Sequence, residues 1–138
     1  MRIFHGLLFA LALVLVVGCG KPDDGSFEVR GRVLVNGKPV AVQGVEQGTG
    51  WVKLQLWQHG PDGKPGETPV EVAVRLDGGF VLSGVQGNGR KGLMPGKYSL
   101  SLEAEENGKR LYPELAKGKS KSVREFAPGS EEIEIALP

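Results

Sequence analysis

The sequence has little cysteine and little histidine, the side chains on which much metal and nucleophilic chemistry depends. It contains one cysteine, Cys19, and two histidines among 138 residues. One cysteine cannot form a disulfide within the chain, and a zinc site needs three or four ligands drawn from Cys, His and carboxylates. We therefore predict no metal, no other cofactor and no disulfide.

An excess of charge of one sign is also absent. Lys and Arg number 17 and Asp and Glu number 16, which leaves a formal net charge of +1. Nucleic acids and anionic lipid headgroups both select proteins with a basic surplus. The balance therefore predicts no nucleic-acid partner and no electrostatic attraction to a membrane.

No apolar run is long enough to span a membrane. The longest is residues 7–17, preceded by Arg2 and no acidic residue. It fits the apolar region of a signal peptide, about 7–15 residues, and falls short of the roughly 20 residues of a transmembrane helix. The end of this run and the three residues after it resemble the lipobox of bacterial lipoproteins, which is cleaved before the cysteine. The stretch is Leu13-Val14-Leu15-Val16-Val17-Gly18-Cys19-Gly20.

This resemblance implies three segments: a signal peptide over residues 1–18, a lipidated Cys19 with a tether over 19–26, and one domain over 27–138. Two or three acyl chains on Cys19 would hold the protein stably on a membrane of the cell envelope. Gly20 stands where an aspartate often marks inner-membrane retention, so the outer membrane is favoured, with the domain periplasmic or surface-exposed. The alternative is an ordinary secretory signal in which Cys19 is incidental.

The remainder of the chain shows the two-residue hydrophobic period of β-strands, interrupted by turn residues. About seven or eight short alternating segments separated by Gly-, Pro- and Asn-rich turns predict an all-β, antiparallel Greek-key β-sandwich. Asn36-Gly37 and Asn107-Gly108 are strong hairpin signals, because both residue types tolerate the positive φ of a type I′ turn. The expected strands are residues 27–35, 38–42, 51–58, 68–76, 80–83, 97–106, 123–126 and 133–137.

The period also predicts which side chains form the core. One face of each segment is apolar, and the apolar faces of the two sheets should meet. In the segment 68–76, the inward face would run from Val70 to Leu76. The expected core comprises Phe27, Val33, Leu54, Val72, Val74, Phe80, Leu82, Tyr98, Leu100, Ile133 and Ile135.

Three stretches carry a family resemblance. They are Val29-x-Gly31-x-Val33-x-Val35-Asn36-Gly37-Lys38-Pro39-Val40, Asp77-Gly78-Gly79-Phe80-Val81-Leu82 and Gly92-Leu93-Met94-Pro95-Gly96-Lys97-Tyr98-Ser99-Leu100. Their order resembles carboxypeptidase-regulatory-like domains, which share the transthyretin-type sandwich, and following a lipobox it resembles small bacterial lipoproteins. The resemblance covers about residues 27–105. Its motifs are structural and imply no catalytic residue.

An enzyme is not expected. After cleavage before Cys19 the only histidine is His59, which lies beside Gly60-Pro61 and is interpreted as a solvated loop residue. No Cys-His or Ser-His-Asp set is available for nucleophilic or general-base catalysis. The transthyretin-like hydrolases, which resemble this fold, use more than one histidine and a Tyr-Arg-Gly-Ser ending that this chain lacks.

The stretch 51–57 is the best candidate for a binding site. The two-residue period places Val52, Leu54 and Leu56 on the core face, and Trp51, Lys53, Gln55 and Trp57 on the opposite face. Exposed tryptophans beside polar groups suit a protein partner or a glycan. The alternative is that the loops 42–50 and 86–92 fold over both tryptophans and bury them. We therefore predict a membrane-anchored structural or protein-interaction module of the envelope, with a carbohydrate-binding module as the alternative.

Overall fold

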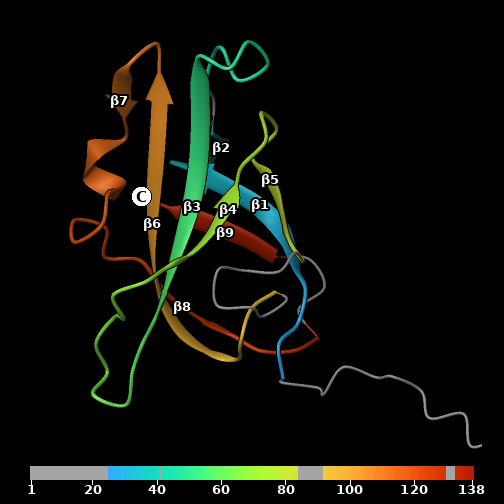
Figure 1. The fold of residues 1–138 in the computed structure, drawn as a ribbon, viewed down its shortest axis with the longest axis vertical. Coiled ribbons are helices and arrows are strands. Elements are labelled where there is room, and N and C mark those ends of the chain that lie inside the picture. The colour runs from blue at the N-terminus through green and yellow to red at the C-terminus, as the bar shows by residue number, and fades with distance from the viewer. Residues whose placement is uncertain (1–24, 41, 84–91, 130–132) are drawn as a thin grey trace, which may run out of the picture.

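The protein is an all-β sandwich (Figure 1). The computed structural model describes residues 25–40, 42–83, 92–129 and 133–138. Within them it has one four-stranded and one five-stranded sheet and a single short 3-10 helix, η1 (Pro113–Leu115). The predicted fold class is confirmed, whereas the signal peptide, Cys19 and most of the tether lie outside the described residues.

The four-stranded sheet is built around β1 (Val29–Val35), which pairs with each of its other strands. Along one edge β1 pairs antiparallel with β5 and then with β2, and along its other edge it pairs with β9. We call it the β1 sheet. Its other strands are β2 (Lys38–Pro39), β5 (Gly79–Leu82) and β9 (Ile133–Leu137).

The five-stranded sheet is built around the long pair of β3 (Gly50–Gln58) and β6 (Gly96–Glu106). These two strands pair antiparallel along the whole of β3. We call it the β3–β6 sheet. Its remaining strands are β4 on the far side of β3, and β7 and β8, which share the far side of β6: β4 (Val70–Ala73), β7 (Lys109–Leu111) and β8 (Val123–Phe126).

The core lies between the two sheets and matches the alternation of the sequence. All the expected core residues are buried except Phe27, which packs partly buried against the others. The prediction that Leu76 lies on the same inward face as Val70 is wrong, because the Leu76 side chain is 48% exposed. The reason is that β4 ends at Ala73, so Leu76 lies in the turn to β5, beyond the inward-facing part of the strand.

The two hairpin signals are confirmed by their backbone angles. Asn36 and Gly37 have φ of 52° and 76°, and Asn107 and Gly108 have 50° and 77°, which is the left-handed geometry of tight hairpins. The second hairpin adds β7, a strand that the alternation did not predict. β9 departs from the antiparallel expectation, because it enters the β1 sheet from the other sheet and lies parallel to β1.

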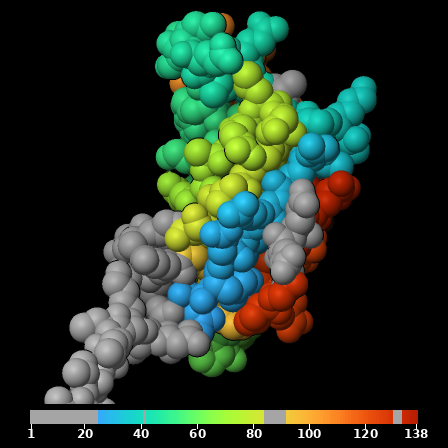
Figure 2. Space-filling model, turned by 90° about the vertical axis from the view of Figure 1, so that its right-hand side faces the viewer, coloured from blue at the N-terminus to red at the C-terminus, as the bar shows by residue number. Residues whose placement is uncertain are grey.

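The domain has two ends along its longest axis. Residues 25–28 enter near the bottom of Figure 1, and the turns over residues 42–49 lie at the top, where β3 begins. The same separation is visible in the space-filling view of Figure 2. Trp51, the second residue of β3, therefore lies toward the end away from the segment that would join the tether.

Candidate functional site

The outer face of the β3–β6 sheet, turned away from the core, contains the candidate residues. The register sets them opposite side chains of β6: Trp51 opposite Glu105, Lys53 opposite Glu103, Gln55 opposite Ser101 and Trp57 opposite Ser99. Opposed residues in adjacent antiparallel strands have Cβ atoms about 4.5–5.5 Å apart, so each pair is in reach of contact. The predicted face is therefore real, with Val52, Leu54 and Leu56 buried on the other side.

The four candidate residues do not share one environment. Gln55 and Trp57 are buried, at 5% and 6% exposure, whereas Trp51 is 37% exposed. Lys53 is intermediate, with 45% of its side chain exposed. We call Gln55, Trp57, Ser99 and Ser101 the covered half of the outer face, and Trp51, Lys53, Glu103 and Glu105 the open half.

The segment 113–122 covers Trp57. It follows β7, begins with η1 and brings the Lys117 ammonium to 4.0 Å from the centre of the Trp57 ring. Leu115 fixes this segment, because its side chain is 2% exposed and belongs to the core cluster. Burial of a tryptophan by the chain itself was the expected alternative, but the segment responsible is not one of the two loops named for it; residues 84–91 lie outside the described range.

A chain of hydrogen bonds crosses the covered half. The indole Nε1 of Trp57 donates to Ser101 Oγ at 2.9 Å, and Ser101 Oγ donates to Gln55 Oε1 at 2.9 Å. Gln55 Nε2 then donates to Glu71 Oε1 at 3.0 Å. Because the carboxylate can only accept, the direction of every donor in the chain is fixed. Gln55 is thus a structural side chain that links β3 to β6 and β4.

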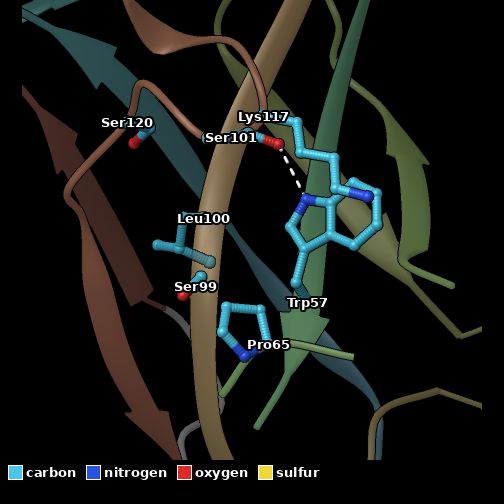
Figure 3. A pocket seen from close by; sticks show the side chains of 8 residues that line it. Trp57, Pro65, Ser99, Leu100, Ser101, Lys117 and Ser120 are labelled. Carbon is cyan, nitrogen blue, oxygen red and sulfur yellow. Dashed lines mark hydrogen bonds between the residues drawn. The ribbon is translucent and has the colours of Figure 1, made fainter. Parts of the chain in front are cut away.

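A cavity of about 150 Å³ lies beside Trp57, between the covered half and the segment 113–122 (Figure 3). Ser99 and Ser101 project into it from β6, Trp57 forms one wall, and the Pro65 ring lies below. Residues 117–120 pass over the other side. Lys117 and Ser120 were not predicted to take part, because they come from a polar, irregular stretch without any motif.

The open half combines one exposed aromatic with charges of both signs. The Lys53 ammonium lies 5.3 Å from the centre of the Trp51 ring and 3.5 Å from Glu71 Oε2. Both partners of this ion pair are more than two-fifths exposed, so it contributes only about 0–1 kcal/mol. Glu103 and Glu105 are half-buried on β6. The open half therefore offers a large indole surface without a rigid charge arrangement.

His59 is not a solvated loop residue, contrary to expectation. It continues β3 as a bridge to Pro65, its backbone N–H donates to Lys97 O at 2.8 Å, and its Nε2 lies 2.7 Å from Ser99 Oγ. The ring is half-buried. Through these contacts His59 extends the pairing of β3 with β6 beyond Gln58, next to the covered half.

One carboxyl group away from this face has a shifted pKa. The pKa of Asp77 is lowered from its ordinary value of 3.8, chiefly because its carboxylate accepts the backbone N–H of Gly79, with a smaller contribution from Arg75. The Gly79 N to Asp77 Oδ1 distance is 2.8 Å. Asp77 belongs to the β4–β5 turn, so the shift reports a turn interaction.

No grouping of three or more His, Cys, Asp or Glu side chains that could hold a metal ion occurs among the residues that the structure describes. Those residues also include no helix long and apolar enough to cross a membrane. Cys19 lies outside the described ranges. No family model, curated protein or solved structure matches the chain.

Proposed function

We propose that the protein is a lipid-anchored, non-catalytic module of the cell envelope that binds a protein partner through the open half of its outer face. In this proposal residues 1–18 are removed, Cys19 carries the lipid, residues 19–26 form the tether and residues 27–138 form the binding domain. The outer membrane is the favoured location. The anchor brings the domain to a membrane surface, and the open half makes the specific contact.

The anchor is supported by the sequence, and the point at which the chain enters the domain determines which end of the domain would lie near it. Val16-Val17-Gly18-Cys19 has the order of a lipobox, and Cys19 is the only cysteine. Residues 25–28 enter at the end of the sandwich away from the start of β3. An anchored domain would therefore hold Trp51 toward the end that is farther from the membrane attachment.

The exposure of Trp51 is the observation that carries the interaction proposal. Tryptophan is a highly buried residue type on average, yet Trp51 is 37% exposed, on the half of the outer face that the segment 113–122 leaves open. Trp is enriched in protein–protein interfaces, where it provides a large rigid contact with one hydrogen-bond donor. The neighbouring Lys53 and Glu103 supply a polar rim of both signs.

A carbohydrate-binding module is the second candidate, and it has less support. A glycan strip along β3 would use two indole faces, at Trp51 and Trp57. Trp57 is 6% exposed, Lys117 lies over its ring, and its Nε1 already donates to Ser101. Only Trp51 remains as a platform for a sugar ring.

The family proposal is that the domain is of the carboxypeptidase-regulatory-like type. Its support is that the quoted stretches fall on β1, β5 and β6, with Asn36 and Gly37 in the tight turn that the first stretch requires. The non-catalytic proposal is supported by the residue inventory, because His59 is the only histidine and Cys19 the only cysteine after the cleavage point.

Lipidation is tested by the intact mass of protein extracted from membranes. We expect a chain that begins at Cys19 and carries two or three acyl groups. Cys19→Ser should leave the protein uncleaved or released from the membrane fraction. A mature chain with another N-terminus and no lipid would refute the anchor while leaving the domain's binding proposal open to its own test.

Partner binding is tested by photocrosslinking in intact cells. A photoreactive residue at position 53 should yield one discrete protein adduct, and Trp51→Ser in the same chain should reduce that adduct at least about tenfold, as expected for loss of an interface tryptophan. The matched control is position 81 on β5, because Val81 is also apolar and 41% exposed but lies in the β1 sheet. Equal adducts from both positions, or an adduct that survives Trp51→Ser, would refute the open half as the binding surface.

A further inference from the structure

The cavity beside Trp57 has features that the binding of a partner by the open half does not use. It lies in the covered half, under the segment 113–122. Its volume of about 150 Å³ is close to that of an apolar protein cavity known to admit one benzene molecule. The space therefore suits one six-membered ring or a branched chain of similar size, and it is too small for a peptide segment.

The walls supply apolar contact from two rigid rings. Trp57 forms one wall and Pro65 lies below it, while the floor is the β6 backbone with Ser99 and Ser101 (Figure 3). The Ser101 hydroxyl accepts from Trp57 and donates to Gln55, so its proton is already used. The part of a ligand that lies between these rings would thus contact flat apolar surfaces and would find few groups able to donate a hydrogen bond to it.

The electrostatic character of the cavity is one-sided. Among the described residues that line it, Lys117 is the only ionisable one and none is a carboxylate. Among the described residues Lys117 has no carboxylate within ion-pair distance, and its ammonium rests 4.0 Å from the centre of the Trp57 ring. A cation–π contact at an exposed site is weak, so the ammonium can leave the ring for an anion at small cost.

A second donor comes from the same turn as Lys117, across the cavity from the resting position of the ammonium (Figure 3). Ser120 Oγ accepts a long hydrogen bond of 3.3 Å from the Ser122 N–H, and within the described part of the chain its own proton has no acceptor. Lys117 and Ser120 both line the cavity from the same turn. Two donors from one turn, one of them charged and able to leave the Trp57 ring, match a group that only accepts, and a carboxylate is such a group.

We infer that this cavity binds a small free carboxylic acid in its ionised form, with the apolar body against Trp57 and Pro65 and the carboxylate on Lys117 and Ser120. The ligand takes the place of the Trp57 ring as the neighbour of the Lys117 ammonium. This site is separate from the open half, and the inference does not depend on the proposed protein partner.

The test uses the full-length protein in detergent. The chain has two tryptophans, and Trp51→Phe removes one of them, so that all tryptophan emission comes from Trp57. Benzoate is the probe and benzamide its neutral isostere, both titrated at constant ionic strength. We expect benzoate to change Trp57 emission saturably and to bind about tenfold or more tightly than benzamide, because a hydrogen bond to a charged group is worth about 1.5–3 kcal/mol.

Lys117→Met should remove the preference for benzoate over benzamide. Lys119→Met is the matched control, because Lys119 lies two residues away and does not line the cavity, and it should keep the preference. Equal binding of the two probes, or a preference that survives Lys117→Met, would overturn the inference. So would the absence of saturation with benzoate.

A second measurement protects the test against a variant that fails to fold. In the unaltered full-length protein, the ¹⁵N–¹H signals of the two indoles can be followed during the benzoate titration. The Trp57 signal should shift, because its Nε1–H belongs to the hydrogen-bond chain at the cavity, and the Trp51 signal should not. Equal shifts of both signals, or a shift of Trp51 alone, would place the probe elsewhere and overturn the inference.

Discussion

The covered half and the open half of the outer face are made by the same pair of strands, β3 and β6, and each contains one tryptophan of β3. The two tryptophans nevertheless have opposite environments. Trp57 is 6% exposed and hydrogen-bonded, whereas Trp51 is 37% exposed and its ring lies beside the Lys53 ammonium. The difference arises from the segment 113–122, which returns over one half only. A strand therefore determines which side chains share a face, and the connection determines whether that face meets solvent.

The largest test of this comparison is truncation of each tryptophan. Trp57→Ala should destabilise the protein by about 3–5 kcal/mol, since it empties a buried site, and Trp51→Ala by less than about 1 kcal/mol. Urea unfolding of the two variants against the unaltered protein measures both values. Similar losses at the two positions would contradict the division into halves.

Truncating Leu115, the buried side chain that holds the segment 113–122 in place, should make the covered half as accessible to solvent as the open half. Leu115→Ala should cost about 2–4 kcal/mol, because the 2% exposed side chain leaves a cavity. In the folded variant, iodide quenching of Trp57 should approach that of Trp51, read in single-tryptophan proteins. Unchanged quenching of Trp57 would show that the segment is held by other contacts.

The hydrogen-bond chain can be broken at its centre. Ser101→Ala leaves the buried Trp57 N–H without an acceptor and should cost about 1–3 kcal/mol. Ser99→Ala, on the same face of β6, loses a contact to the half-buried His59 and should cost less. The Trp57→Phe, Ser101→Ala double-mutant cycle should show coupling, and additive losses would argue against the bond.

A variant in the other sheet serves as a reference for both halves. Gly37→Val should destabilise the protein by about 1–2 kcal/mol, because φ at this position is 76° and a β-branched residue is strained there. Both tryptophans should keep their emission maxima, since the hairpin belongs to the β1 sheet. Unchanged thermal stability would contradict the tight turn.

The smallest expected effect is a pH dependence from Asp77 in the β4–β5 turn. Its pKa is lowered in the folded state, chiefly by the Gly79 N–H, so its stabilising contribution is present above the ordinary value of 3.8 and is lost as pH falls below it through the folded pKa. Asp77→Asn should flatten the stability profile in that acidic window. An identical slope in the variant would remove Asp77 as its source.

The sequence predicted which side chains share one face of a strand, but it did not predict which part of that face another segment of the chain covers. Alternation placed Val52, Leu54 and Leu56 in the core, because side-chain direction along a strand is a local property. The burial of Trp57 depends on a segment more than fifty positions away whose only buried apolar side chain is Leu115, so no local pattern could reveal it. The same limit applies to β9, since alternation is identical in parallel and antiparallel strands.

The parallel pairing of β9 with β1 has a mechanical consequence. β1 directly follows the residues that would lead to the lipid, and it is held along both edges, by β5 and β2 on one side and by β9 on the other. A pull along the tether loads these ladders lengthwise, so their hydrogen bonds, perpendicular to β1 in the antiparallel pairs and slanted in the parallel pair with β9, share the load instead of unzipping singly. Drag on a bound partner would then be transmitted to the membrane through the strand best placed to resist extraction.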